Sequence, residues 1–175
     1  MRTRGRDRSP HGRLSFVVLL VAALATGAGA CAPPRDLAQA IEVTNVTTGF
    51  MTARPEGGQN KIVPAISLRL RNVGAEELDT LQLNAVFRIL DKPNDDRGSG
   101  FIRSVSPDPL EPGRASEAYT LQAQRGYTGE QPPGEMFRHR QFRDMRVEVF
   151  AKFRSQAWQR VAEFTIQRQL LRAPS

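Results

Sequence analysis

The chain has 175 residues, of which 39% are hydrophobic and 25% are charged. This length suffices for one domain, and this composition excludes a disordered polymer and a protein that spans a membrane many times. The formal net charge is +7, but residues 1–30 contribute +4 of it, because they hold five Arg and one Asp. The remainder is nearly balanced in charge, so we expect no nucleic-acid partner.

Residues 1–30 follow the order of a secretory signal peptide: a polar start that bears Arg, an apolar run over 14–25, and a short stretch of small residues. The apolar run is about 12 residues long, whereas a helix that crosses a bilayer needs ~20. We therefore predict export followed by cleavage. The alternative is an uncleaved anchor, as in a signal-anchored subunit of an envelope transport system.

The single cysteine of the chain follows this run, in Ala28-Gly29-Ala30-Cys31. These residues resemble a bacterial lipobox, with Ala28 where Leu is usual, in which the Cys is acylated and the chain is cut before it. The resemblance implies a protein attached to the membrane by lipid at Cys31. Because Ala32 follows rather than Asp, it also implies the outer membrane, facing the periplasm. The alternative is an ordinary signal-peptidase site that leaves Cys31 as a free thiol.

Beyond this point the sequence predicts a tether and one domain. Residues 31–40 contain Pro33-Pro34 and form a stiff, lipid-anchored tether, 41–170 form the domain, and 171–175 form a C-terminal tail. The period of two that is typical of strands is clear over 66–70, 81–89 and 147–153, and shorter near 41–43, 101–105, 119–123 and 162–166. The polar stretch 92–98 is expected to be a solvated hairpin loop.

No amphipathic helix of 10–15 residues separates these strands, which disfavours a parallel βαβ architecture. Each alternating strand has one apolar face, so two sheets must pack these faces together. We predict an all-β fold, an immunoglobulin-like antiparallel β-sandwich of about seven strands. Its core is expected to contain four aromatic residues, Phe87, Phe153, Trp158 and Phe164.

Three motifs lie within Ser67–Leu121: a strand ending in Asn (Leu68-Arg69-Leu70-Arg71-Asn72), then Phe87-Arg88-Ile89-Leu90-Asp91, then Leu110-Glu111-Pro112-Gly113. Together they resemble the FxLYD-type and related immunoglobulin-like domains of bacterial envelope proteins, with Ile-Leu-Asp in place of Leu-Tyr-Asp. The resemblance implies adhesion, scaffolding or accessory binding, and no catalytic residues.

The densest basic cluster of the domain is Arg138, Arg140, Arg143 and Arg146, interleaved with Phe137 and Phe142. Because Arg pairs bidentately with phosphate and carboxylate, the cluster predicts a site for lipid head groups, acidic glycans or a protein partner. The alternative is a solvated strand edge. Tyr127, in the long non-periodic stretch 125–134, is expected to be an exposed contact on a loop. The predicted partner-binding residues are Arg138, Arg140, Arg143 and Tyr127.

The sequence thus predicts a non-enzymatic, lipid-anchored envelope protein that binds or scaffolds another envelope component, most simply an envelope protein. We predict no cofactor and no metal, because Arg138 and Arg140 flank His139 and their charge would repel a metal ion. The alternative from another class is a periplasmic hydrolase. It would need a pocket in which His139 meets a carboxylate, that of Asp108, Glu111 or Asp144.

Overall fold

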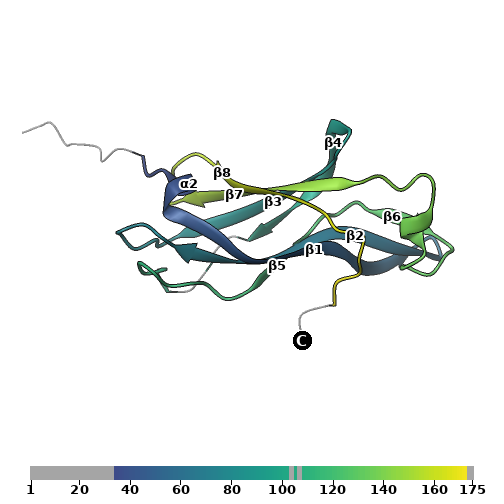
Figure 1. Cartoon of the computed structure of the whole chain (residues 1–175), viewed down its shortest axis with the longest axis horizontal. Coiled ribbons are helices and arrows are strands. Elements are labelled where there is room, and N and C mark those ends of the chain that lie inside the picture. Colours follow the sequence, from purple (N-terminus) through teal and green to yellow (C-terminus); the bar gives the residue numbers. More distant parts are fainter. Residues whose placement is uncertain (1–33, 103–104, 106–107, 173–175) are drawn as a thin grey trace, which may run out of the picture. The chain divides into compact units, whose positions relative to one another are not determined.

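The computed structural model describes residues 34–102, 105 and 108–172, without the side chains of 93, 95 and 96. The predicted signal peptide, Cys31 and the last three residues of the predicted tail lie outside the described residues. The described chain forms two antiparallel sheets of four strands each (Figure 1). The predicted all-β sandwich is therefore confirmed, with eight strands in the described residues instead of about seven.

The two sheets divide the chain unevenly. The first contains β1 (Ile41–Glu56), β2 (Gln59–Asn72), β5 (Tyr119–Gln122) and β6 (Tyr127–Gly129). Its order is β1-β2-β5, and β6 pairs with another part of β2. The second contains β3 (Leu81–Ile89), β4 (Lys92–Ile102), β7 (Met145–Phe153) and β8 (Gln159–Thr165), in the order β4-β3-β7-β8.

The core forms where the apolar faces of β2, β3 and β7 meet. Along β3 every second residue from Leu81 to Ile89 is buried, as the sequence alternation predicts. The predictions for Phe87 and Phe153 are confirmed, since both are buried, and Phe164 is half-buried against the core. The prediction for Trp158 is wrong, because its side chain is 39% exposed.

Trp158 precedes β8 in the hairpin between β7 and β8, and it packs on other surface groups. Its ring meets that of Phe101 edge-on, with the centroids 5.9 Å apart, and Lys152 Nζ lies 6.0 Å from its centroid. Phe101 is itself 52% exposed. The indole therefore covers the outer surface and adds little to the core.

Two strands differ from the sequence expectation. β1 is 16 residues long and not a short edge strand; a β-bulge between Thr44 and Thr47, with Asn45 at φ 51°, breaks its alternation. The prediction of a loop over 92–98 is wrong, because β4 begins at Lys92 and the turn consists of Leu90 and Asp91 alone. An edge strand accepts the polar residues that made this stretch resemble a loop.

The folded part begins before residue 41. A single helical turn, α2 (Leu37–Ala40), is capped by the Asp36 side chain, which accepts from the Ala38 amide. Leu37 is fully buried, and its amide donates to Gln159 Oε1 at 2.8 Å. The later half of the predicted tether, 31–40, is thus part of the sandwich.

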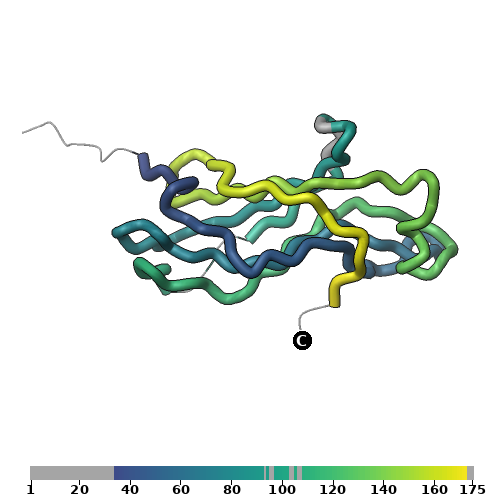
Figure 2. The backbone as a smooth tube through the Cα atoms, in the orientation of Figure 1, coloured from purple at the N-terminus to yellow at the C-terminus, as the bar shows by residue number. Residues whose placement is uncertain are grey.

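The chain after β8 covers one open edge of the sandwich. The Phe50 amide donates to the Gln169 carbonyl at 2.8 Å, and the Leu171 amide donates to the Phe50 carbonyl at 2.7 Å. Figure 2 shows this yellow segment running from the second sheet to the blue β1. Glycine at position 49 permits the approach, because a Cβ there would lie 2.7 Å from the Gln169 oxygen.

The opposite open edge is closed where β4 passes β5. A Cβ at Gly100 would lie 2.9 Å from the Gln122 amide nitrogen, so only glycine fits this crossing. The Ser99 amide donates to Gln124 Oε1 at 2.9 Å, and the Arg125 amide donates to the Arg97 carbonyl at 3.1 Å. Both edges of the sandwich are therefore at least partly protected from pairing with other chains.

The outer face of the second sheet carries a network of charges around Glu148, which is only 8% exposed. Arg88 donates to its carboxylate at 2.9 Å, while Arg160 lies at 3.4 Å and Arg146 at 3.7 Å. The last two also pair with Glu163. A shielded carboxylate requires such partners, so Arg146 belongs to this network and not to the loop cluster in which the sequence placed it.

The fully buried side chain of Asn72, at the end of β2, joins two turns. Its Nδ2 donates to the carbonyls of Leu110 (2.7 Å) and Glu76 (2.8 Å), and its Oδ1 accepts from the Gly74 amide. Its own carbonyl accepts from Gly113 at 2.8 Å, in the Pro-Gly turn. This one amide therefore links the strand-ending Asn to the Leu-x-Pro-Gly segment.

We expect Asn72→Ala to lower the free energy of unfolding by at least about 2 kcal/mol, because several buried polar groups lose their partner at ~1–3 kcal/mol each. Urea unfolding monitored by circular dichroism measures this loss. Asn94→Ala, at an exposed position of β4, is the matched control and should change stability by less than ~0.5 kcal/mol. Equal effects of the two substitutions would contradict this role for Asn72.

Candidate functional site

The candidate site lies at the end of the sandwich where the β1–β2 hairpin, β6 and residues 130–144 come together, at the right of Figure 1. β6 is held against β2 by the pairs Asn60–Gly129 and Ile62–Tyr127. This approach requires glycine at position 126, because a Cβ there would collide with the Ile62 carbonyl. A fixed short strand thus positions Tyr127 and the loop that follows it.

Four aromatic rings pack together under the loop and form what we call the aromatic cluster: Phe50, Tyr127, Phe137 and Phe142. Phe50 lies 5.2 Å from Phe142 and 5.4 Å from Phe137, measured between ring centroids. Tyr127 stacks on Phe142 at 4.6 Å with an interplanar angle of 29°. Such contacts add to the hydrophobic stabilisation of the rings, so the loop rests on a rigid base.

Tyr127 supports the loop with its hydroxyl as well as its ring. The Arg143 amide donates to the hydroxyl oxygen at 3.2 Å, and the hydroxyl donates to the Arg143 carbonyl at the same distance. The residue is half-buried. Its ring therefore packs inside this end of the sandwich instead of extending outward as the expected loop contact, and its visible role is to hold the loop.

A second attachment joins the loop to the C-terminal segment. Arg168 donates to the Asp144 carboxylate at 2.7 Å and lies over the Phe142 ring, 5.2 Å from its centroid. This hydrogen bond lowers the pKa of the Asp144 carboxyl below its ordinary value. Asp144 therefore remains ionised and paired with Arg168 at neutral pH.

Three of the four predicted loop cations remain together: Arg138, Arg140 and Arg143, which we call the arginine rim. All three are exposed, and none has a side-chain hydrogen bond or ion pair within the described chain. Arg138 ends the short 3-10 turn η2 (Met136–Arg138), and the other two follow it on the loop. The rim therefore presents three uncompensated positive charges over six residues of a supported loop.

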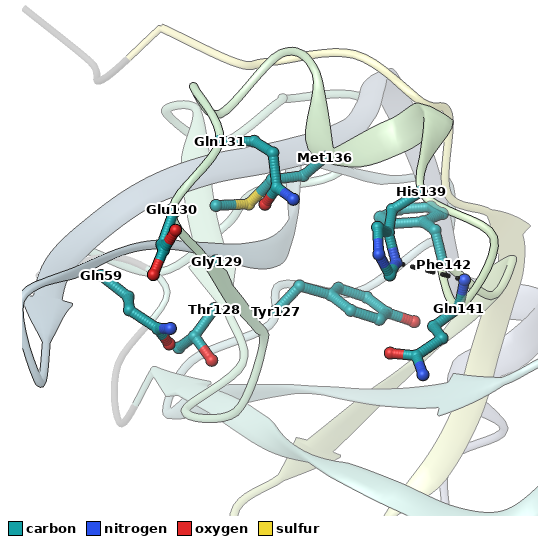
Figure 3. A pocket seen from close by; sticks show the side chains of 10 residues that line it. All are labelled: Gln59, Tyr127, Thr128, Gly129, Glu130, Gln131, Met136, His139, Gln141 and Phe142. Carbon is teal, nitrogen blue, oxygen red and sulfur yellow. Dashed lines mark hydrogen bonds between the residues drawn. The ribbon is translucent and has the colours of Figure 1, made fainter.

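Beside the rim is a hollow of about 330 Å³, drawn in Figure 3. Gln59 and Thr128 lie at one end of it, His139 and Gln141 lie at the other, and the Tyr127 ring lies between them. Its full lining is Gln59, Tyr127, Thr128, Gly129, Glu130, Gln131, Met136, His139, Gln141 and Phe142. The hollow thus combines amides and hydroxyls with an aromatic and thioether floor.

The hydrolase alternative requires a carboxylate within hydrogen-bonding reach of His139. Although His139 lines the hollow, its Nδ1 accepts from the Gln141 amide at 3.3 Å. No hydrogen bond or ion pair of the described residues joins it to a carboxylate. Of the candidate acids, Asp144 is held by Arg168, and Asp108 and Glu111 line a different hollow. The arrangement that this alternative needs is therefore not assembled here.

Two further features bear on the site. No helix in the described part of the chain combines the length and the apolar character needed to cross a membrane. Nor, among these residues, do three or more His, Cys, Asp or Glu side chains gather in a way that could hold a metal ion.

The fold defines the class of protein, an all-β antiparallel sandwich. No family model matches the sequence, and no curated protein matches it. Three solved structures have a weak structural likeness to this chain. The Northeast Structural Genomics Consortium target SoR45 is 15% identical over 75% of this chain and 89% of that chain, with a TM-score of 0.42. The putative ApaA protein of Bordetella pertussis is 17% identical over 73% of this chain and 93% of that chain, with a TM-score of 0.39, and a protein from Archaeoglobus fulgidus is 12% identical over 72% of this chain and 98% of that chain, with a TM-score of 0.36.

We expect Tyr127→Phe to cost about 0.5–1.5 kcal/mol of stability, the usual value of a lost hydrogen bond, and to loosen the loop. Hydrogen–deuterium exchange should show faster exchange at the Arg143 amide, which loses its acceptor. The control is Tyr119→Phe, since the Tyr119 hydroxyl has no hydrogen bond within the described residues. If both variants exchange alike in this loop, the Tyr127 hydroxyl does not support it.

Proposed function

We propose that this chain is a non-enzymatic protein of the cell envelope, anchored by lipid, that holds another envelope component at the loop end of its sandwich. The observation that carries the proposal is the arginine rim, three exposed guanidinium groups without an internal partner in the described chain. Guanidinium groups bind carboxylates and phosphates bidentately. An anionic group of another envelope component is the natural partner of such a surface.

The support beneath the rim favours binding. The aromatic cluster, the Tyr127 hydroxyl and the Asp144–Arg168 pair fix the loop backbone before any partner arrives. A preorganised loop loses less conformational entropy on binding than a flexible one, so more of the interaction energy appears as affinity. The uncompensated charges would also speed association with an anionic partner at low ionic strength.

The envelope location rests on the sequence: the signal-peptide pattern of 1–30 and the lipobox-like residues before Cys31. An acylated Cys31 would carry more than one chain, as stable attachment requires. Arg35 already contacts the sandwich, since its carbonyl accepts from Gln159. The four residues from Cys31 to Arg35 span at most ~14 Å, so the sandwich of the anchored protein would stand close to the membrane surface. Because Ala32 follows Cys31, the proposed anchor lies in the outer membrane and the sandwich faces the periplasm.

We expect the protein purified from membranes to have the mass of residues 31–175 plus acyl chains, because signal cleavage and acylation both occur at Cys31. Intact mass spectrometry measures this directly. Cys31→Ala should move the protein from the membrane fraction to the soluble fraction or leave it as unprocessed precursor. A wild-type mass equal to all 175 residues would favour the signal-anchored alternative, and a mass of 31–175 without acyl chains would contradict the lipid anchor.

Charge reversal of two rim residues, Arg138→Glu with Arg143→Glu, should reduce capture of the partner by at least about tenfold. The melting temperature should stay unchanged, because neither side chain forms a hydrogen bond or ion pair within the described chain. Crosslinking in cells followed by affinity purification measures capture. The control with the same charge change is Arg114→Glu with Arg172→Glu, two exposed positions outside the loop. Undiminished capture by the rim variant would remove this surface from the proposal.

A further inference from the structure

We infer that the hollow beside the arginine rim binds one uncharged sugar unit of an acidic oligosaccharide, while the rim binds the acidic group of the neighbouring unit. The inference rests on the proposed function, since it names the chemical class of the component held at the same end of the sandwich. It follows from three properties of the site: the free polar groups of the lining, the apolar floor, and the separation of positive charge from the hollow.

The first property is a set of unused amides. Gln59, Gln131 and Gln141 line the hollow, and within the described chain none of their side-chain amides forms a hydrogen bond. Each amide offers two donors and a carbonyl acceptor. A sugar hydroxyl is also both donor and acceptor, so three amides on facing walls match a ring with several hydroxyl groups. Thr128 adds a fourth group of this dual kind.

The second property is the floor. Tyr127 and Phe142 stack at 4.6 Å, and Met136 lies beside them in the lining. A pyranose ring has a face of C–H groups that packs on aromatic rings, while its hydroxyl groups point outward to the walls. The volume, about 330 Å³, is at the small end of the usual range of ligand sites, ~300–1,000 Å³. The hollow is thus large enough for one sugar ring.

The third property is the position of the charges. No Arg or Lys lines the hollow, and its one carboxylate, that of Glu130, would repel an anion placed inside. The rim residues are instead the chain neighbours of lining residues: Arg138 and Arg140 flank His139, and Arg143 follows Phe142. A ligand that is polar but uncharged at one unit and acidic at the next therefore fits better than a small free anion.

The test uses the purified full chain in detergent, titrated by isothermal calorimetry at low salt with three probes. Two are acidic, hyaluronan tetrasaccharide and unsulfated chondroitin tetrasaccharide, in which uncharged and acidic units alternate, and one, chitotetraose, is uncharged. We expect at least one acidic probe to bind, and chitotetraose to bind about tenfold more weakly because it does not engage the rim. Inorganic phosphate at the same concentration should not displace the acidic probe.

Three variants separate the hollow from the rim. Gln131→Ala and Gln59→Ala, on two parts of the lining, should each weaken binding of the acidic probe by about tenfold. The double variant Arg138→Glu with Arg143→Glu should weaken binding by a similar factor, and the binding that remains should depend less on salt concentration than that of the wild type. Gln122→Ala, an exposed Gln on β5, is the control. The melting temperature of each glutamine variant is measured, and only a variant that melts as the wild type does is counted. Because there are two such variants, a folding defect in one does not decide the result.

The inference is wrong if neither acidic probe binds, if both glutamine variants bind as wild type does, or if phosphate competes equally with the sugar. Its failure is distinguishable from that of the proposed function. When charge reversal of the rim abolishes capture of an envelope protein but no sugar binds, the binding role stands and the partner is a protein. When neither capture nor sugar binding depends on the rim, both proposals fail.

Discussion

The packing of two apolar sheet faces against each other constrains everything else in this protein. β2, β3 and β7 direct every second side chain inward, and residues such as Leu68, Phe87 and Val147 are completely removed from water. Where these strands face each other, side chains of the described residues fill the interior. The candidate site lies outside this interior, at one end of the sandwich.

The sequence predicts those parts of the fold in which a strand has one wet face. For β3 and β7, the bounds that the sequence predicts are nearly those of the structure. The sequence predicts only a short strand in place of β1, because the bulge interrupts the alternation, and Phe50, a central core residue, is therefore missed. β4 resembled a loop because its charged and Pro-bearing start is tolerated only at a sheet edge. The sequence predicts a buried Trp158 because its ring is large and apolar, but the residue type does not tell which face of the hairpin the ring lies on.

The candidate site could be predicted only in part. The arginine rim is contiguous in sequence, and so it was visible there, but Arg146 in the same cluster belongs to a strand and faces Glu148. The hollow was not visible, since Gln59 and the loop residues that complete it are about 70 positions apart and meet only through the pairing of β2 with β6. The interleaved Phe137 and Phe142 were the one local signal of the packing beneath the loop.

The hydrogen bonds between Phe50 and the segment that contains Gln169 and Leu171 have a consequence for biosynthesis. A ribosome delivers this segment after every strand of both sheets, so a nascent chain has an uncovered β1 edge until position 171 has emerged. An uncovered edge is a template for aggregation. The edge of β1 is therefore protected only once the last strand and the segment that follows it are in place.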